Sequence, residues 1–593
     1  MVTKKNAEKT SVTTKQKKAG SKRQNLFQLG ISLLIIVLLN IIFSYLFTRF
    51  DLTTEKRYSL SSATKQFIRQ VDDVVLFKVY LDGDFPAGFK RLRSETKEML
   101  DEFRAYNDNI QYKFINPSEG TDKKAIKKLH EQLMSKGLLP TDLQVKTSDG
   151  SSRQLIFPGA LVSYKGREVP LQLLVSQQGY SAEEQLNHSI QGLEYNLANV
   201  IRKLITVNKP KIAFLDGQAE LPDLRLADIS STLSEYYSVE RVTINSKISA
   251  LATRDTIKKQ FVNKFKLLII AKPDSAFAEK DKFFIDQFVM HGGKVLWLID
   301  PVYACMDSLR TSDQTVAFAK NLNLEDMLFD YGVRINTDLI LDLNALPIPV
   351  VTGQSGGKPT QEFLPWYFFP LLTPSINHPI VNNLNLITTE FISSIDTVGG
   401  KGIRKTILLT TSQYSSPVNT PARISLDLLN KKLDKRSFKS PFQAVAVLLQ
   451  GQFKSVFKDR LPLEITQDKA NFDYREQSAE NAMIVISDGD IIKNQIDFKQ
   501  GYALPLGYDQ YTNQTFGNKD FILNCVDYLC DDSGLMTVRS RELKLRLLDK
   551  EKIKNSRLNW QLLNSVLPVL LILIFGLIQL ILRKRKYTRP IKR

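Results

Sequence analysis

Two long apolar stretches, one near each end of the chain, constrain this sequence more than any other feature. Leu26–Phe47 holds 22 residues without a charge, and sixteen of them are Leu, Ile, Val or Phe. At about −0.5 kcal/mol each, those sixteen side chains favour membrane insertion by roughly 8 kcal/mol before Asn40 and the other polar positions subtract from it. Leu558–Leu582 adds 25 uncharged residues, with Trp560 near one end and Pro568 inside. Each stretch is long enough to cross a bilayer core as a helix.

A cleaved signal peptide is the alternative for the first stretch. Its apolar region is too long for a signal peptide, and Thr48-Arg49-Phe50-Asp51 follows where a small-residue cleavage site would be expected. We therefore predict one transmembrane helix over residues 25–48 and a second, kinked at Pro568, over residues 558–582.

The net charge of +19 comes mainly from the two tails. Residues 1–24 hold eight Lys or Arg and one Glu, and residues 583–593 hold seven Lys or Arg and no acid. A nucleic-acid-binding protein gathers basic residues on a folded face, so this distribution argues against nucleic acid as a partner. Basic tails beside apolar stretches are typical of cytoplasmic ends in contact with membrane lipid. The bias is clear at the first stretch and nearly balanced at the second. We let the first decide and predict a two-pass protein of a bacterial inner membrane, with both basic tails cytoplasmic and residues 48–557 in the periplasm.

Residues 49–205 predict a first α/β domain. Val74–Leu81 has the apolar pattern of a buried strand, Phe89–Tyr106 that of an amphipathic helix, and Ile110–Ile115 that of a second strand. This βαβ unit resembles half of a thioredoxin-like fold, but the CxxC motif of thioredoxin redox chemistry is missing. Further predicted elements are a helix over Ala125–Lys136, a strand pair within Gln154–Leu174 turned at Lys165-Gly166-Arg167, and one long helix over Glu183–Leu204.

Residues 206–538 predict a second α/β domain. Its apolar strands alternate with helices, which indicates a mostly parallel sheet covered on both faces. The predicted strands are Lys211–Asp216, Val239–Ile244, Lys266–Ala271, Lys294–Asp300, Lys405–Thr411, Ala444–Gln450 and Met483–Ser487, and the predicted helices are Leu226–Tyr236, Glu279–Met290 and Phe521–Leu529. Leu346–Pro379, rich in Pro and Gly, is predicted to be an extended connection rather than a core element. Residues 539–557 are predicted to form a basic juxtamembrane helix that lies on the membrane or on a partner.

Motifs for catalysis and for cofactor binding are missing or incomplete. Gly353–Thr360 (GQSGGKPT) approaches a phosphate-binding loop, but Pro359 stands where Ser or Thr must reach magnesium, so a flexible loop is favoured. The four histidines are not at metal-ligand spacing from one another or from a cysteine, which argues against structural zinc. Cys305 follows a predicted strand without the flanking glycines of a nucleophile elbow, and a small core thiol explains it equally well. We expect no enzymatic activity, no cofactor and no metal.

Several segments carry a resemblance to a known family. They are Arg49–Leu60 (RFDLTTEKRYSL), Glu183–Asn196 (EEQLNHSIQGLEYN), His291–Pro301 (HGGKVLWLIDP), Asp330–Asp338 (DYGVRINTD) and Ala444–Arg460 (AVAVLLQGQFKSVFKDR). Their order between two terminal apolar stretches is similar to that of the gliding-motility-associated ABC-transporter auxiliary family, GldG, usually described as the substrate-binding component of the transporter. The resemblance covers nearly the whole chain.

That resemblance implies a fold, partners and a process. It implies a second domain related to the class I glutamine-amidotransferase-like fold, shared with an intraflagellar-transport protein, without the amidotransferase nucleophile. Family relatives often show Gly-His-x-Glu after the first strand of this domain, where this chain has Gly217-Gln218-Ala219-Glu220. The implied partners are an ABC permease and its ATPase subunit, and the implied process is gliding motility.

Candidate contact residues lie at the carboxyl ends of the predicted parallel strands, where open α/β sheets bind ligands. They are Asp216, Gly217, Glu220, Asp300 and Asp488, and each is also a common turn residue. These observations leave three candidate functions for the protein. The first is a non-catalytic accessory subunit of an ABC system that binds a solute, a polymer or an envelope protein. The second is an envelope scaffold that couples cytoplasmic work to other motility proteins without a small ligand. The third, a membrane-tethered hydrolase or amidotransferase, has no catalytic constellation behind it.

Overall fold

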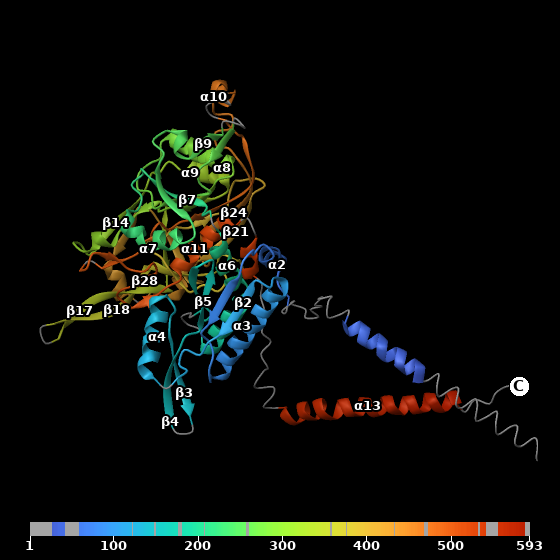
Figure 1. The fold of residues 1–593 in the computed structure, drawn as a ribbon. Coiled ribbons are helices and arrows are strands. Elements are labelled where there is room, and N and C mark those ends of the chain that lie inside the picture. Colours follow the sequence, from blue (N-terminus) through green and yellow to red (C-terminus); the bar gives the residue numbers. More distant parts are fainter. Residues whose placement is uncertain are drawn as a thin grey trace, which may run out of the picture.

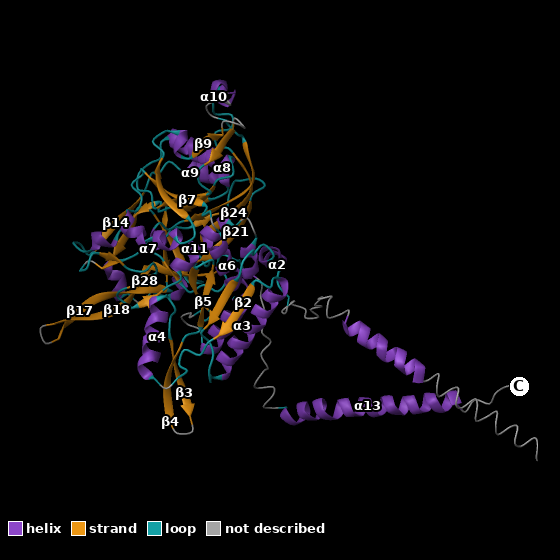
Figure 2. Ribbon diagram, viewed as in Figure 1, coloured by secondary structure: helices purple, strands orange, loops and turns teal. Residues whose placement is uncertain are grey.

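The computed structural model describes residues 26–41 and 59–587, apart from residues 121, 148–149, 176–180, 207, 256–259, 356–357, 375, 432, 468–472, 498, 532–533 and 541–555. Two α/β bodies of different size make up the region between the terminal apolar helices (Figures 1 and 2). The basic tail 1–24, the last six residues and most of the predicted juxtamembrane helix lie outside the described residues.

The helix α13 (Arg557–Tyr587) contains the second predicted span. Among the described helices, it is the one that is both long and apolar enough to cross a membrane, and its apolar stretch is not buried against protein. Pro568 lies inside it, and the helix continues beyond Leu582 through the first basic residues of the tail. At the other end of the chain a shorter apolar helix is described over Leu26–Ile41. The remainder of the first predicted span lies outside the described residues.

The smaller body is built on a four-stranded sheet of order β2-β1-β5-β6. Its strands are β1 (Val75–Val79), β2 (Ile110–Phe114), β5 (Gly159–Tyr164) and β6 (Arg167–Gln172). β1 and β2 are parallel and joined by α3 (Ala87–Tyr106), as the predicted βαβ unit requires, while β5 and β6 form an antiparallel hairpin beside β1. Lys165 and Gly166 make the predicted turn with φ of +45° and +79°. The other elements are α2 (Ser62–Ile68), α4 (Lys123–Ser135) and the hairpin of β3 (Thr141–Thr147) and β4 (Gly150–Ile156).

The helix that closes this body is interrupted, where one continuous helix was predicted. α5 (Ala182–Gln191) ends at Gly192, whose amide donates to the carbonyls of His188 and Ile190, and α6 (Leu193–Ile205) starts immediately after it. Ser181 and Glu184 form a capping box at the start of α5. Glycine has a low helix propensity, which explains why the interruption falls at this residue.

The end of the second predicted domain belongs to the core of the smaller body. The 3₁₀ helix η6 (Leu535–Ser540) places Leu535, Met536 and Val538 among the buried residues of that core. The Tyr195 hydroxyl lies 2.9 Å from the Met536 sulfur. Leu535, Met536 and Val538 therefore belong with the smaller body, although the predicted range of the second domain, 206–538, included them.

The larger body is organised around a mixed sheet of order β17-β18-β21-β24-β25-β12-β11-β7-β8, with β19 beside β18. The strands from β25 to β8 are mutually parallel, and those from β25 to β17 are antiparallel. The sheet is therefore mixed, whereas the sequence predicted a mostly parallel sheet. The strands are β7 (Lys211–Asp216), β8 (Ser238–Thr243), β11 (Leu267–Ala271), β12 (Lys294–Leu298), β17 (Ala345–Ser355), β18 (Lys358–Pro374), β19 (Ile387–Thr388), β21 (Arg404–Thr410), β24 (Ala444–Lys454) and β25 (Gln477–Ile486).

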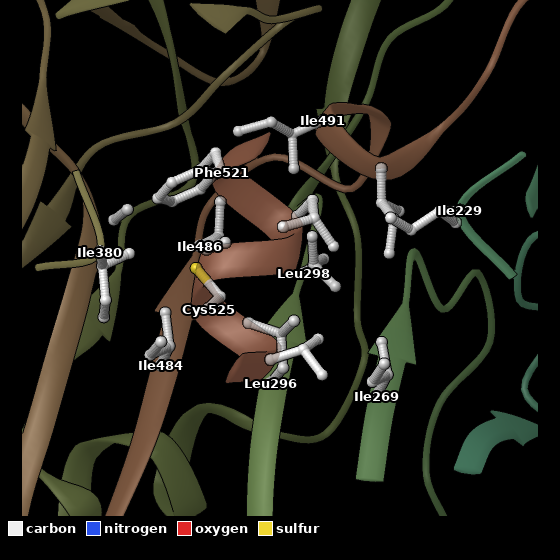
Figure 3. Packing of buried hydrophobic residues seen from close by; sticks show 14 of the residues in the cluster. Ile229, Ile269, Leu296, Leu298, Ile380, Ile484, Ile486, Ile491, Phe521 and Cys525 are labelled. Atoms are coloured by element: carbon white, nitrogen blue, oxygen red, sulfur yellow. The ribbon is translucent and has the colours of Figure 1, made fainter. Parts of the chain in front are cut away.

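Helices cover both faces of this sheet. On one face α11 (Asn518–Cys530) inserts Phe521 and Cys525 against Leu296, Leu298 and Ile484 of the sheet (Figure 3). On the other face α8 (Glu279–Met290) and α9 (Glu325–Tyr331) pack around Trp297. Cys525 and Cys530 lie on the same helix as unbridged thiols.

The segment Leu346–Pro379 is a core element at its base, contrary to the prediction. β17 and β18 pair as a long antiparallel hairpin that projects from the body (Figure 1). Trp366 and Phe368 of β18 are fully buried in a cluster of their own. Gly353 pairs with Thr360 near the hairpin tip, so the glycine-rich stretch joins two strands and not a strand to a helix. That geometry rules out a phosphate-binding loop there.

The remaining elements of the larger body are the helix α7 and a set of shorter helices and strands. They are α7 (Asp223–Ser234), η1 (Ile248–Ala250), β9 (Ala252–Asp255), β10 (Gln260–Asn263), β13 (Val302–Tyr303), η2 (Met306–Leu309), β14 (Gln314–Ala319), β15 (Arg334–Ile335), β16 (Asp338–Asp342), β20 (Ile395–Asp396), β22 (Ser415–Asn419), β23 (Ala422–Ser425), η3 (Leu426–Asn430), η4 (Lys435–Ser437), α10 (Leu463–Gln467), η5 (Asp490–Ile492), β26 (Ile496–Asp497), β27 (Tyr502–Ala503), β28 (Tyr508–Asp509) and β29 (Gln514–Thr515).

Candidate functional site

Charged side chains gather where three parallel strands of the large sheet end. Ala271 of β11 pairs with Leu298 of β12, which in turn pairs with Ile486 of β25. The residues that follow these strands therefore emerge at one edge of the sheet, the edge at which open α/β sheets bind ligands. Lys272 follows β11, Asp300 follows β12, and a Ser-Asp-Gly-Asp turn follows β25.

Four side chains from this edge and Glu390 from a separate loop form what we call the ion-pair network: Asp300, Lys272, Asp490, Lys493 and Glu390. Lys272 Nζ lies 3.0 Å from Asp300 Oδ2 and 2.5 Å from Asp490 Oδ2. Lys493 Nζ lies 2.5 Å from Asp490 Oδ1 and 2.8 Å from Glu390 Oε2. Negative and positive groups alternate along the network, so each cation has an anion on both sides.

Burial and neighbouring charges shift the pKa values of Lys272 and Asp490 in opposite directions. Burial alone would lower the pKa of Lys272, but the Asp300 and Asp490 carboxylates outweigh burial and raise it. Burial alone would raise the pKa of Asp490, but Lys493 and Lys272 outweigh it and hold this pKa well below the usual range. Lys272 and Asp490 therefore both stay charged at neutral pH.

Asp488 lies beneath the network and differs from Asp490. Its carboxyl accepts the amide of Asp490 at 2.7 Å and that of Glu390 at 3.3 Å. Burial, followed by repulsion from Asp300 and Asp490, raises the pKa of Asp488 well above the usual range for aspartate. The Asp488 carboxyl thus holds the turn through the Asp490 and Glu390 amides and lies against other carboxylates rather than against a lysine.

Gly489 gives a direct test of this packing. A methyl group on its Cα would lie 2.6 Å from both Cβ and Cγ of Lys272 and 3.0 Å from the Lys272 Cα. We expect Gly489→Ala to displace Lys272 and to lower the free energy of unfolding by about 1–3 kcal/mol. Gly353→Ala is the matched control, since a methyl group there meets nothing within 4 Å. Thermal unfolding curves of the two variants that coincide would contradict the prediction.

A pocket of about 460 Å³ opens over the network. Its walls include Lys272, Asp300, Asp490, Lys493 and Glu390, and also Glu220, Tyr303, Cys305 and Lys320. Glu220 is buried; its Oε2 accepts the Gln218 amide at 2.8 Å, whereas its Oε1 has no hydrogen-bond partner within the described part of the chain. Burial raises the pKa of Glu220. An unsatisfied buried oxygen in a charged pocket indicates a place for a polar group of a ligand or for water.

The structure brings together some of the predicted site residues and separates others. Glu220 and Asp300 line the pocket, and Asp488 lies beneath it. Asp216 is instead 3.5 Å from Arg241 on the neighbouring strand β8. Gly217 is a turn residue with φ of +126° and does not line the pocket.

Four of the five network members are not among the predicted contact residues, and one of them, Asp490, lies two residues after the predicted Asp488. Lys272 directly follows a buried strand, the same position that singled out Asp300, and a search for basic as well as acidic residues there would have found it. Lys493 lies three residues after Asp490. Glu390 carries no such signal, because it reaches the network from a loop remote from these strands in sequence.

One thiol lies among the described residues that line the pocket. Cys305 is exposed at its edge and accepts the Asp307 amide at 3.4 Å. No histidine is among the described residues that line the pocket, so a base for this thiol would have to be a carboxylate or a lysine of the lining, such as Glu220 or Lys320. Within the described residues, no group of three or more His, Cys, Asp or Glu side chains is arranged to hold a metal ion.

Comparison with known proteins places the larger body in a family. A family model described as an ABC-type uncharacterized transport system, an auxiliary family, matches residues 209–525, and one described as a domain of unknown function matches residues 54–163. An uncharacterized protein of Borreliella burgdorferi is 21% identical over 572 residues, covering 95% of this chain and 99% of its own length.

Two solved structures are similar at a low level. The mmIFT52 N-terminal domain is 12% identical with a TM-score of 0.28, over 54% of this chain and 98% of its own. A protein of Parabacteroides merdae described as thua-like is 11% identical with a TM-score of 0.25, over 55% of this chain and 90% of its own. The match to residues 209–525 spans more than half of the 593 residues, and the chain therefore belongs to the auxiliary family described as an ABC-type uncharacterized transport system.

Proposed function

We propose that this protein is a non-catalytic accessory subunit of an ABC transporter, anchored by a helix at each end, that binds a polar substrate on the periplasmic side. The membership of an ABC transport auxiliary family and the exposed apolar helix α13 support a membrane-bound accessory role. The apolar helix Leu26–Ile41 and the basic tails support two spans of an inner membrane with both termini cytoplasmic. The sequence resemblance to GldG supports gliding motility as the process served.

The observation that carries the binding role is the pocket at the strand ends. Its lysines are neutralised by carboxylates, and Glu220 offers an unsatisfied buried oxygen. A site of this kind recognises a ligand by hydrogen bonds. We infer a polar, hydrogen-bonding substrate and a permease and ATPase that carry out the transport.

Two fold assignments belong to this proposal. The order β2-β1-β5-β6, with a parallel βαβ unit followed by an antiparallel hairpin, supports a thioredoxin-like smaller body. The parallel strands β8-β7-β11-β12-β25, with helices on both faces, support an amidotransferase-like larger body.

Copurification tests the accessory role. We expect the tagged full-length chain, extracted in mild detergent, to bring down a multi-span permease and an ATPase in fixed proportion. A chain that ends at Ser556, before α13, is the control and should lose the permease, because α13 exposes an unburied apolar surface for it. Isolation of the full-length chain alone would contradict the proposal.

A reporter fused near residue 300 tests the topology. A reporter that proves cytoplasmic would contradict the periplasmic placement of the folded region.

A scaffold without a small ligand is the second candidate. The hairpins β17–β18 and β3–β4 both reach away from the two bodies, as elements that contact other proteins do (Figure 1). Val351 and Phe363 of the first hairpin are more than half exposed. Ala304→Trp, which places an indole in the pocket wall, separates the two candidates. A substrate-binding subunit loses transport with this variant, whereas a scaffold retains its function.

A further inference from the structure

A second hollow, which we call the β17 groove, lies beside the projecting hairpin. It has a volume of about 710 Å³. Its walls come from η2, from β17, from Phe369 of β18 and from η3. Glu390 lines both this groove and the pocket over the ion-pair network, so the two hollows adjoin.

The walls of the β17 groove are apolar. Leu309, Leu346 and Phe369 are members of the core cluster around Trp366, and Ile348 and Leu429 pack against that cluster while remaining partly exposed. The groove is therefore the uncovered side of a hydrophobic core. An uncovered apolar hollow of this size is typical of a binding site.

The rim of the groove is acidic. Asp313, Glu390, Asp427 and Asp509 line the groove together with one basic residue, Arg310. Of these acids, Glu390 is paired with Lys493 and Asp509 is buried, so Asp313 and Asp427 carry the charge of the rim. Arg310 lies 3.1 Å from Asp307, which offsets its charge. Asp313 and Asp427 are exposed, and neither has an ion-pair partner in the part of the chain that the structure describes. In a chain of net charge +19, this local excess of acid favours a basic partner.

The free edge of β17 also favours hydrogen-bond donors. β17 is the last strand of the sheet, and Pro347 stands opposite Pro365 of β18. Pro347 and Pro349 have no N–H, so this part of the edge offers carbonyl acceptors without donors. An edge of this kind resists the addition of another strand. It accepts donors such as lysine ammonium and arginine guanidinium groups.

We propose that the β17 groove binds a segment of a partner protein that carries apolar side chains flanked by lysine or arginine. The apolar side chains enter the hollow, and the basic side chains meet Asp313, Asp427 and the carbonyl edge of β17. This binding role goes beyond transport of a polar substrate, and its test needs neither permease nor ATPase.

Short labelled peptides provide the test. The full-length protein, placed in nanodiscs of zwitterionic lipid, is titrated into three peptides, and binding is followed by fluorescence anisotropy. One peptide alternates Lys and Leu, a second alternates Glu and Leu, and a third alternates Lys and Ser. We expect measurable binding of the Lys/Leu peptide alone, with an affinity that falls as salt is added.

Charge reversal on the rim provides the control comparison. The double variant Asp313→Lys, Asp427→Lys is expected to weaken binding of the Lys/Leu peptide by at least about tenfold. The matched variant Asp108→Lys, Asp330→Lys changes two exposed acids that do not line the groove and is expected to change it by less than about twofold. All four positions are exposed, so both variants should fold. Equal binding of the Glu/Leu peptide, equal binding of the Lys/Ser peptide, or equal effects of the two double variants would overturn the proposal.

Discussion

Replacing Lys272 by methionine is expected to lower the free energy of unfolding by about 3–5 kcal/mol, the usual cost of removing one partner from a buried ion pair. Lys272 is the cation that lies between Asp300 and Asp490 at 3.0 and 2.5 Å. Without it, Asp300 loses its ammonium partner and Asp490 retains only Lys493. The change is measured by thermal unfolding of the full-length protein, followed by the fluorescence of the fully buried Trp297 and Trp366.

Two further variants sharpen this prediction. Lys499→Met removes an exposed lysine outside the network and should change stability by less than about 0.5 kcal/mol. Adding Asp300→Asn to Lys272→Met should recover part of the loss, because it removes the carboxylate left uncompensated while keeping an oxygen for the Gly489 amide. A loss below about 1 kcal/mol for Lys272→Met would show that the network behaves like a surface ion pair.

Local sequence pattern predicted the buried strands and the amphipathic helices of the fold. β7, β11 and β12 were found as apolar runs because both of their faces are covered, and α3 and α8 were found from helical periodicity. The direction of β24 and β21 against β25 was not predictable in this way, since an apolar strand looks the same in a parallel and in an antiparallel pair. The hairpin β17–β18 was missed because its prolines resemble those of a loop. Prolines are tolerated in β17 because it is the edge strand.

The residues of the candidate site also fall into those that local sequence pattern predicted and those that it did not. Asp300, Glu220 and Asp488 were predicted because the ends of parallel strands meet at one edge of the sheet. Asp216 satisfies the same rule, yet it pairs with Arg241, a partner that only the register of β7 with β8 reveals. Glu390 enters the network through packing between distant parts of the chain, and no local pattern encodes such a contact.

A second group of buried polar side chains surrounds Asp286 on the other face of the sheet. Asp286 of α8 is fully buried and accepts four hydrogen bonds. Their donors are Ser455 Oγ at 2.6 Å, Tyr331 Oη at 2.9 Å, Val456 N at 3.0 Å and Gln287 Nε2 at 3.0 Å. Burial raises the pKa of Asp286 to about 6, although these donors act in the opposite direction. The site thus ties α8, α9 and the segment after β24 together through one carboxyl group.

Asp286 should make the protein more stable in mild acid. Its native carboxyl takes up a proton near pH 6, whereas in the unfolded chain it does so near 3.8, the ordinary pKa of aspartate. Between these values the native state binds more protons, so the free energy of unfolding rises as the pH falls. Relative to neutral pH, the titration of Asp286 raises the free energy of unfolding by about 1 kcal/mol at pH 5 and by about 2 kcal/mol at pH 4. The gain approaches a limit of about 3 kcal/mol at still lower pH.

The variant Asp286→Asn keeps the shape of the side chain but cannot titrate, which isolates this contribution from the rest of the protein. We expect the difference in free energy of unfolding between wild type and variant to be constant above pH 7. Between pH 7 and pH 4 the wild type should gain about 2 kcal/mol relative to the variant. Unfolding midpoints measured at each pH provide the test. A difference that stays the same at pH 4 would mean that the four donors outweigh burial, and that Asp286 is a charged anchor of the core throughout this range.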